Sequence, residues 1–132
     1  MKAFHRSSLI ILESFLALTA IGGAIGLLTG TGAPPREILT HSPFADYTVP
    51  GLALLLIVGG PALVAVILLA RKDPRDLLVC GLTAFSIIIF ESVEILSIGS
   101  PAGIARNLQV LYIMVGALIG GIALSARRRE AA

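Results

Sequence analysis

The sequence predicts an all-α integral membrane protein, a four-helix bundle with both termini in the cytoplasm and a long first extracytoplasmic loop. Three observations predict this fold class. The chain of 132 residues is 56% hydrophobic and only 14% charged, whereas soluble domains hold roughly 25% charged residues. Its apolar residues form four long runs, and its basic residues gather between those runs. We expect residues 1–132 to form a single membrane domain.

The four apolar runs cover about residues 8–30, 49–70, 77–98 and 107–126. Each is about 20 residues or longer, which is the length of helix that crosses a bilayer core of about 30 Å. A soluble helix carries a polar face, but residues 51–70 hold no charge at all. The first run is longer than the apolar core of a signal peptide, which spans about 7–15 residues. We therefore expect it to stay in the protein as a transmembrane span.

The basic residues predict the orientation in a cell (inner) membrane. Eight of the ten Lys and Arg lie at the two termini and in the second loop. The first and third loops hold one each, Arg36 and Arg106. Because basic residues stay on the cytoplasmic side, both termini are expected there. The eight are Lys2, Arg6, Arg71, Lys72, Arg75, Arg127, Arg128 and Arg129.

Composition argues against several classes of partner and site. The net charge of +2 is small and its basic residues follow the loops, so a nucleic-acid partner is not expected. The single cysteine, Cys80, excludes an internal disulfide and a thiolate metal site. We expect no cofactor and no metal site, and the bilayer itself as the main partner.

The third span carries two carboxylates on one face. At 100° per residue, one narrow arc holds Cys80, Thr83, Ile87, Glu91, Glu94 and Ile98. Acids within a span point to the bundle interior because lipid cannot solvate them. Counted from the cytoplasmic edge, Glu91 lies about 21 Å and Glu94 about 25 Å into the bilayer.

The fourth span runs back and is predicted to complete the cluster. Gln109 falls at the depth of Glu94, and Tyr112 falls at the depth of Glu91. A short connection makes the third and fourth spans antiparallel neighbours. The sequence thus predicts an outer-leaflet site for a ligand or ion. It is made of Glu91, Glu94, Gln109 and Tyr112, with a rim of Asp46, Tyr47, His41 and Arg106.

Three interpretations of this cluster stay open. The acids bind a proton, a cation or a cationic ligand, since two adjacent carboxylates in lipid resist joint ionisation. Alternatively they clamp helices, with Glu94 paired to Arg106 and Glu91 to Tyr112. In the third interpretation they are simply solvated at the membrane boundary.

Glu13 is a second intramembrane acid, about 7 Å from the cytoplasmic edge of the first span. One interpretation is an interfacial residue paired with Arg6 or with a basic loop residue. The other is a second carboxylate station in a transmembrane relay.

Glycine patterns predict close packing. Gly59-Gly60-Pro61 predicts a kink or a close contact within the second span. Gly22 and Gly26 in the first span, and Gly116 and Gly120 in the fourth, permit helices to approach closely. This packing is expected within the chain, with a homodimer or another membrane protein as the alternative partner.

The segments SPFADYTVPG, VEILSIG and LQVLY resemble those of a family of small bacterial membrane proteins with four transmembrane helices. The resemblance runs from about residue 42 to residue 112. It implies the four-span fold and assigns no activity. The positions that match are Pro43, Asp46, Tyr47, Pro50, Glu94, Gln109 and Tyr112.

In size and in Glu13 the chain also resembles the small multidrug-resistance transporters. It departs from them in its long first outer loop, its lack of tryptophan and the acids of its third span. The sequence contains no recognisable Ser/His/Asp catalytic set. A lipid-modifying enzyme that uses Glu91 and Glu94 as acid and base is an alternative. We expect a non-enzymatic membrane protein that binds or transports a small ligand, proton or cation at the carboxylate cluster. The alternative is a structural or accessory subunit in which the cluster only locks helices.

Overall fold

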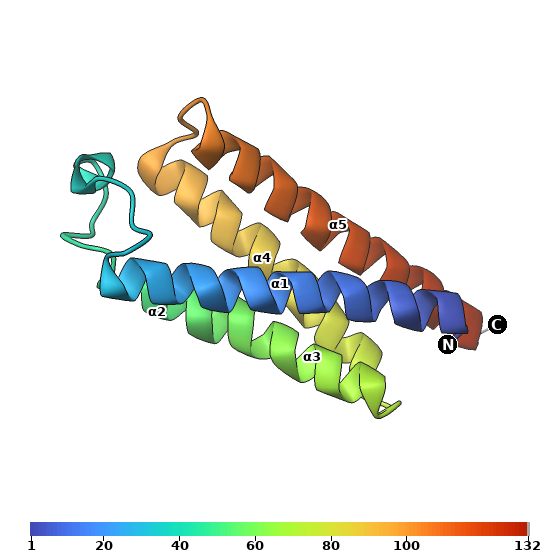
Figure 1. The fold of residues 1–132 in the computed structure, drawn as a ribbon. Helices are drawn as coiled ribbons and strands as arrows, with labels where there is room; N and C mark the ends of the chain where they lie inside the picture. Colours follow the sequence, from blue (N-terminus) through green and yellow to red (C-terminus); the bar gives the residue numbers. More distant parts are fainter. Residues whose placement is uncertain (132) are drawn as a thin grey trace.

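The computed structural model describes residues 1–131, which form helices and connecting loops with no strand in that range. Four spans within it are long and apolar enough to cross a membrane. The predicted all-α, four-span fold class is confirmed. Figure 1 shows the elements in order: α1 (Ala3–Thr29), η1 (Arg36–Leu39), α2 (Thr48–Ala53), the π-helical η2 (Leu54–Gly59), α3 (Gly60–Ala70), α4 (Asp76–Ile98) and α5 (Ile104–Ala131).

Two helices extend beyond the predicted spans. α1 begins at Ala3 instead of residue 8, and α5 runs from Ile104 to Ala131 instead of 107–126. Hydropathy marks only the part of a helix that lipid surrounds, whereas polar residues continue the same backbone hydrogen bonds in water. The sequence prediction was therefore right about the spans and too short at these helix ends.

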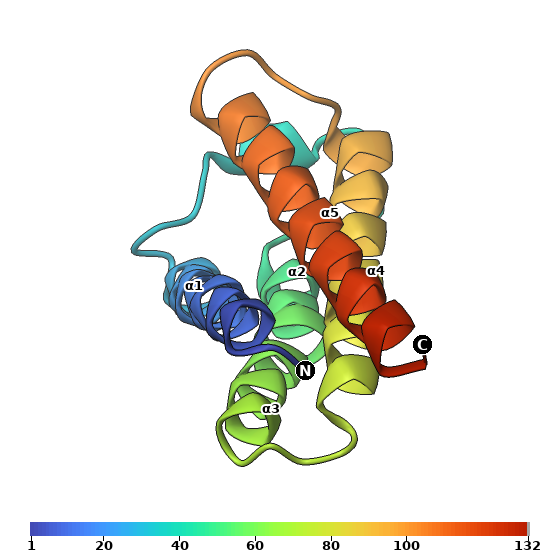
Figure 2. The ribbon, with the colours of Figure 1, turned by 90° about the vertical axis from the view of Figure 1, so that its right-hand side faces the viewer.

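The four spans form a bundle in which α1 and α4 occupy opposite corners. The second span, made of α2, η2 and α3, packs against both of them, and so does α5. The largest interface joins α1 to the second span, and the next largest joins α4 to α5. Figure 2, which looks from the side of the two termini, shows α1 and α4 separated by the other two spans.

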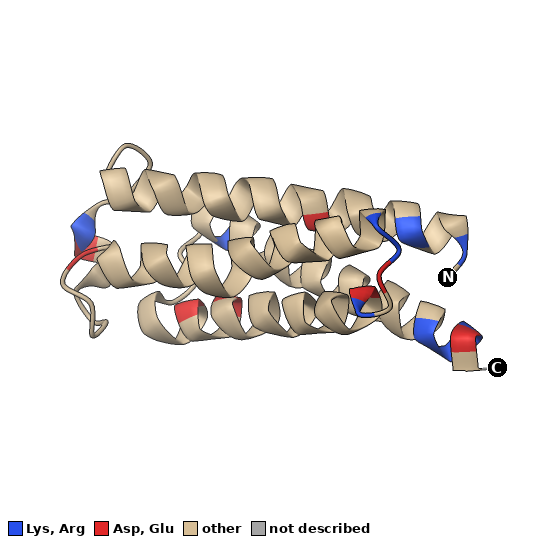
Figure 3. Ribbon diagram, turned by 90° about the horizontal axis from the view of Figure 1, so that it is seen from below, with Lys and Arg blue, Asp and Glu red and all other residues tan. Residues whose placement is uncertain are grey.

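The two ends of the bundle differ, and we name them by their contents. The terminal end holds both chain termini and the turn 71–75, and the loop end holds the loops 30–47 and 99–103 (Figure 1). Charged residues gather at both ends, while only a few acidic positions interrupt the apolar spans (Figure 3). The two halves of the bundle, α1 with the second span and α4 with α5, diverge toward the loop end (Figure 1).

Gly116 lets α5 lie directly on α4. A Cβ atom added there would come within 2.7 Å of Ile87 Cγ2, 3.0 Å of Ile88 Cγ1 and 3.3 Å of the Ala84 carbonyl oxygen. Gly120 faces the same helix, at 3.5 Å from Ala84 Cβ. The Gly116–Gly120 pattern thus serves packing within the chain.

The second span contains the predicted irregularity as a π-helical stretch instead of a kink. η2 widens the helix over Leu54–Gly59, and the N–H of Gly60 bonds to the carbonyl of Leu55, five residues back. Pro61 has no N–H to donate. A wider turn before it leaves fewer backbone carbonyl groups without a hydrogen-bond partner. Gly59 also lies against α1, since a Cβ there would be 2.9 Å from Ile21 Cγ1.

An ion pair closes the terminal end. Arg6 Nη1 lies 2.9 Å from Asp76 Oδ2 and also donates to the carbonyl oxygen of Leu69 at 2.7 Å. One guanidinium therefore joins α1 to the end of α3 and the start of α4. The side chains of Arg6 and Asp76 are 18% and 7% exposed, so the pair is largely removed from solvent.

Candidate functional site

A cavity of about 600 Å³ lies toward the loop end, where the two halves of the bundle diverge. Its wall is formed by α1, the first loop, the second span, α4 and α5. Most of the lining side chains are apolar, and the polar ones include Glu91, Glu94, Tyr47 and Tyr112. A concave apolar space with a few polar groups is typical of small-molecule sites.

Glu91 and Glu94 lie on successive turns of α4 and face this cavity. Glu91 is only 4% exposed, and its Oε2 atom has no hydrogen-bond partner among residues 1–131. Glu94 is half-buried, and its Oε2 accepts a hydrogen bond of 2.9 Å from Gln109 Nε2. One oxygen of the inner carboxyl is thus without a partner in the described chain, while the outer carboxyl is held by α5.

Gln109 is the polar link between α4 and α5. Its side chain is buried, and its Nε2 donates both to Glu94 and, at 3.1 Å, to the carbonyl oxygen of Gly99. Gly99 ends α4, so Gln109 fixes the end of that helix as well as the Glu94 carboxylate. Gln109 therefore supports Glu94 but is not itself part of the cavity wall.

Tyr112 lines the cavity but does not bond to Glu91. Its ring packs near Phe15 of α1, with 6.5 Å between ring centres, and no Tyr112–Glu91 hydrogen bond occurs in the described chain. The alternative interpretation of a Glu91–Tyr112 clamp is therefore wrong. Both side chains contribute to one wall instead, which leaves the tyrosine hydroxyl available to a ligand.

Tyr47 belongs to the cover of the cavity. It is 8% exposed, lies just before α2 and donates its hydroxyl to the carbonyl oxygen of Pro35 at 3.2 Å. Burial raises the pKa of Tyr47, and the negative charges of Glu37 and Glu94 add to this effect. Tyr47 therefore stays a neutral donor that holds the first loop over the cavity.

The other three predicted rim residues do not line the cavity. His41 is exposed. Asp46 is exposed as well and accepts a 3.0 Å hydrogen bond from the N–H of Thr48, which lowers the pKa of Asp46. Arg106 donates to the carbonyl oxygen of Ser100 at 2.7 and 3.0 Å. Within residues 1–131 no ion pair joins Arg106 to Glu94, so the predicted Glu94–Arg106 clamp is wrong too.

Glu13 lies outside this cavity, in the core between α1 and α4. It is fully buried and hydrogen-bonded to Thr83. Arg6, its expected partner, pairs with Asp76 instead. Within residues 1–131 no ion pair joins Glu13 to a basic residue, so the interpretation of Glu13 as an interfacial residue paired with Arg6 or with a basic loop residue is wrong.

Two polar residues of the cavity wall, Thr19 and Ser97, were not predicted from the sequence. Ser97 follows Glu94 by three residues and so shares its helix face, a spacing that would have identified it. No such spacing identifies Thr19, because its position in the cavity wall depends on how α1 is rotated in the bundle.

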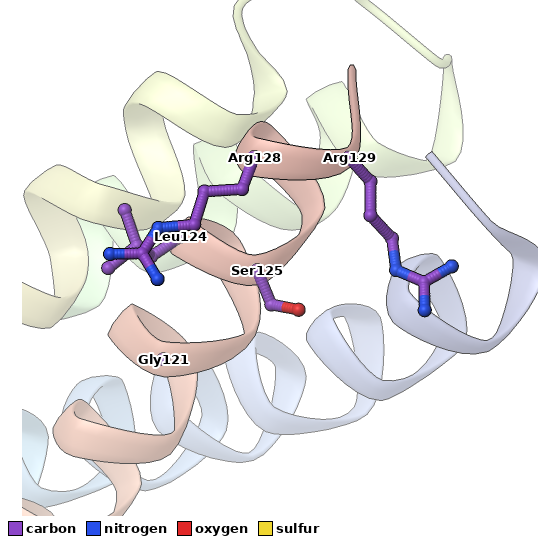
Figure 4. Close-up of a pocket in the computed structure, with 5 residues that line it drawn as sticks. All are labelled: Gly121, Leu124, Ser125, Arg128 and Arg129. Carbon is purple, nitrogen blue, oxygen red and sulfur yellow. The ribbon is translucent and has the colours of Figure 1, made fainter. Parts of the chain in front are cut away.

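A second hollow, of about 300 Å³, lies on α5 near the terminal end and is lined by Gly121, Leu124, Ser125, Arg128 and Arg129 (Figure 4). Its two guanidinium groups point in different directions and do not converge on one position. Only one helix forms its lining. We therefore place the candidate site in the larger cavity.

Comparison with protein-family models, with curated proteins and with solved structures gave no match. In the described part of the chain, no group of three His, Cys, Asp or Glu side chains is arranged to hold a metal ion.

Proposed function

We propose that this membrane protein binds a small organic cation with an apolar body in the cavity, and that Glu91 and Glu94 recognise its charge. One observation carries the proposal: a buried carboxyl oxygen of Glu91, without a partner among residues 1–131, faces a largely apolar cavity of about 600 Å³. A buried polar atom without a partner is costly, and a positively charged ligand group removes that cost. The apolar wall accommodates the rest of the molecule.

A bare metal ion or an enzymatic reaction is less well supported than an organic cation. Calcium takes 6–8 oxygen ligands, whereas the cavity offers two carboxylates. Acid and base catalysis would require both carboxyls to contact the reacting atoms of one substrate, whereas recognition of a positive charge requires only their proximity, and Glu94 Oε2 is already bonded to Gln109. We therefore propose a non-enzymatic binding protein.

Binding of tetraphenylphosphonium to purified protein in nanodiscs tests this proposal. The double variant Glu91→Gln/Glu94→Gln should bind this cation at least about tenfold more weakly, because a buried charged partner is lost. Tetraphenylborate, which has the same shape and opposite charge, should bind poorly to the wild type. Glu37→Gln, in the exposed η1 turn, serves as the matched control. Equal cation binding by the wild type and the double variant contradicts the proposal.

The second candidate function is that of a structural or accessory subunit, and the two hydrogen bonds of Gln109 favour it. In that case the same double variant lowers the melting temperature and leaves cation binding unchanged. Another membrane protein, or a second copy of the chain, would then co-purify with the wild type.

We further propose that both termini lie in the cytoplasm and that the protein resides in a bacterial cell membrane. The orientation is supported by eight basic residues at or near the terminal end, against two, Arg36 and Arg106, near the other end. The bacterial source is proposed on the resemblance of the segments SPFADYTVPG, VEILSIG and LQVLY to those of small bacterial four-helix membrane proteins.

A further inference from the structure

Glu13 is a carboxyl group in the apolar core, away from the cavity. It and Thr83 are both 0% exposed, although they come from helices at opposite corners of the bundle. On its own helix, Glu13 is flanked one turn away by Leu9, Leu16 and Ala17, all of them buried. A carboxylate anion is strongly disfavoured in such surroundings.

Counting hydrogens at Thr83 indicates the form of Glu13. The Thr83 hydroxyl oxygen lies at hydrogen-bond distance from Glu13 Oε1 and from the carbonyl oxygen of Cys80, at 2.9 Å in the latter case. A hydroxyl has one hydrogen to donate and can also accept, whereas a carbonyl can only accept. If Thr83 donates to Cys80, the hydrogen between Thr83 and Glu13 comes from Glu13.

The second carboxyl oxygen agrees with this assignment. Glu13 Oε2 is buried and has no hydrogen-bond partner within residues 1–131. As the carbonyl oxygen of a neutral acid it lacks only one weak interaction, whereas as half of an anion it would require donors or a cation.

The surrounding charges do not supply a cation. Toward the terminal end from Glu13, Arg6 is hydrogen-bonded to Asp76 and to the Leu69 carbonyl oxygen. His5 lies two turns away from Glu13 on α1. The Cys80 thiol, which lies beside the carboxyl on α4, is a weak neutral donor and carries no positive charge. Residues 60–70 of the second span and 111–125 of α5 contain no Asp, Glu, Lys, Arg or His.

We propose that Glu13 is a proton-binding site at the centre of the bundle, where it holds a proton at neutral pH and donates it to Thr83. This site is separate from the cavity and does not depend on a ligand there. Release of the proton would leave an anion in the apolar core, so it requires water or a cation to reach Glu13. Proton release is thereby linked to an opening of the packing around Glu13 and Thr83.

Infrared spectroscopy of the protein in nanodiscs at neutral pH tests the proposal. The wild type should show the carbonyl stretching band of a protonated carboxylic acid, and Glu13→Gln should lose a component of it. Thr83→Val, which removes the hydroxyl at similar volume, should retain this component at a shifted position. Glu37→Gln should leave it unchanged.

Each other outcome counts against the proposal. A folded Glu13→Gln protein whose protonated-acid band equals that of the wild type shows that Glu13 is ionised. A component that does not move in Thr83→Val shows that the proton is not shared with Thr83. Glutamine is a neutral isostere of the protonated acid and can donate to Thr83, so failure of Glu13→Gln to fold at neutral pH also contradicts the proposal.

Discussion

The side-chain amide nitrogen of Gln109 in α5 donates hydrogen bonds to both the Glu94 carboxylate and the carbonyl oxygen of Gly99, at the end of α4. Replacing Gln109 with leucine removes both hydrogen bonds and leaves a half-buried carboxylate without its donor. We expect Gln109→Leu to lower the free energy of unfolding by about 1–2 kcal/mol, measured by reversible denaturation in detergent micelles. Asn107→Leu, at an exposed position on the same helix, is the control and should change stability much less. Equal effects of the two changes would contradict a structural role for the Gln109 amide.

Gly116 has no space for a side chain, because a Cβ would lie 2.7 Å from Ile87 Cγ2. We expect Gly116→Ala to destabilise the protein by about 1–3 kcal/mol through overpacking. Gly121→Ala is the matched control on the same helix, since a Cβ added there would meet no neighbouring element within 4 Å in the described chain. That change should be neutral or slightly stabilising, because alanine favours helix. Thermal unfolding of both variants distinguishes them, and a neutral Gly116→Ala would show that α4 and α5 are packed less tightly.

Arg6 is bonded to Asp76 and to the Leu69 carbonyl in largely buried surroundings. We expect Arg6→Met to cost about 1.5–3 kcal/mol, because it leaves the Asp76 carboxylate without its charged partner. Arg75→Met breaks a different ion pair, with Asp73, in which the arginine side chain is 70% exposed. Exposed pairs contribute little, so this control should hardly alter the melting temperature. The expectation fails if the two variants melt together.

The Asp73 carboxylate lies in the turn at the terminal end, outside the spans. Hydrogen bonds from the Arg75 side chain, and then from its backbone N–H, lower the pKa of Asp73 to about 2. A lowered pKa means that the stabilising contribution is present above the ordinary value of about 3.9 and is lost as the pH falls toward 2. Titration of the Asp73 carboxyl carbon by nuclear magnetic resonance should give that low value. In Arg75→Gln the pKa should rise but stay below the ordinary value, since the backbone donor remains; an unchanged pKa would exclude the guanidinium as its main cause.

Labelling of introduced cysteines tests the proposed orientation. The native thiol of Cys80 is fully buried, so background labelling should be low. We expect a membrane-impermeant maleimide to label Ala45→Cys in intact cells and Pro74→Cys only after the membrane is opened. Both positions are exposed and lie at opposite ends of the bundle. The reverse pattern would place both termini outside.

Much of this architecture could be predicted because lipid imposes simple rules on a chain. Four spans followed from hydropathy, and the contact of Gln109 with Glu94 followed from counting 1.5 Å per residue along two antiparallel helices. The partner of Glu13 did not follow, because the Thr83 contact crosses the bundle diagonally and depends on the rotation of α1 and α4. The pairing of Arg106 with Glu94 was wrong because the Arg106 side chain bonds instead to the carbonyl oxygen of Ser100, in the loop 99–103. The cavity depends on how two halves of the bundle diverge, and no local pattern in the sequence encodes that divergence.

The π-helical stretch of the second span holds one residue more than an α-helix would need to join its two halves. Deleting one residue between Leu54 and Gly59 would therefore restore ordinary helical geometry there and leave the faces of α2 and α3 in register. The same deletion elsewhere in the span would rotate one half against the other by about 100°. The second span should therefore tolerate the loss of one residue at this place better than at any other position along its length.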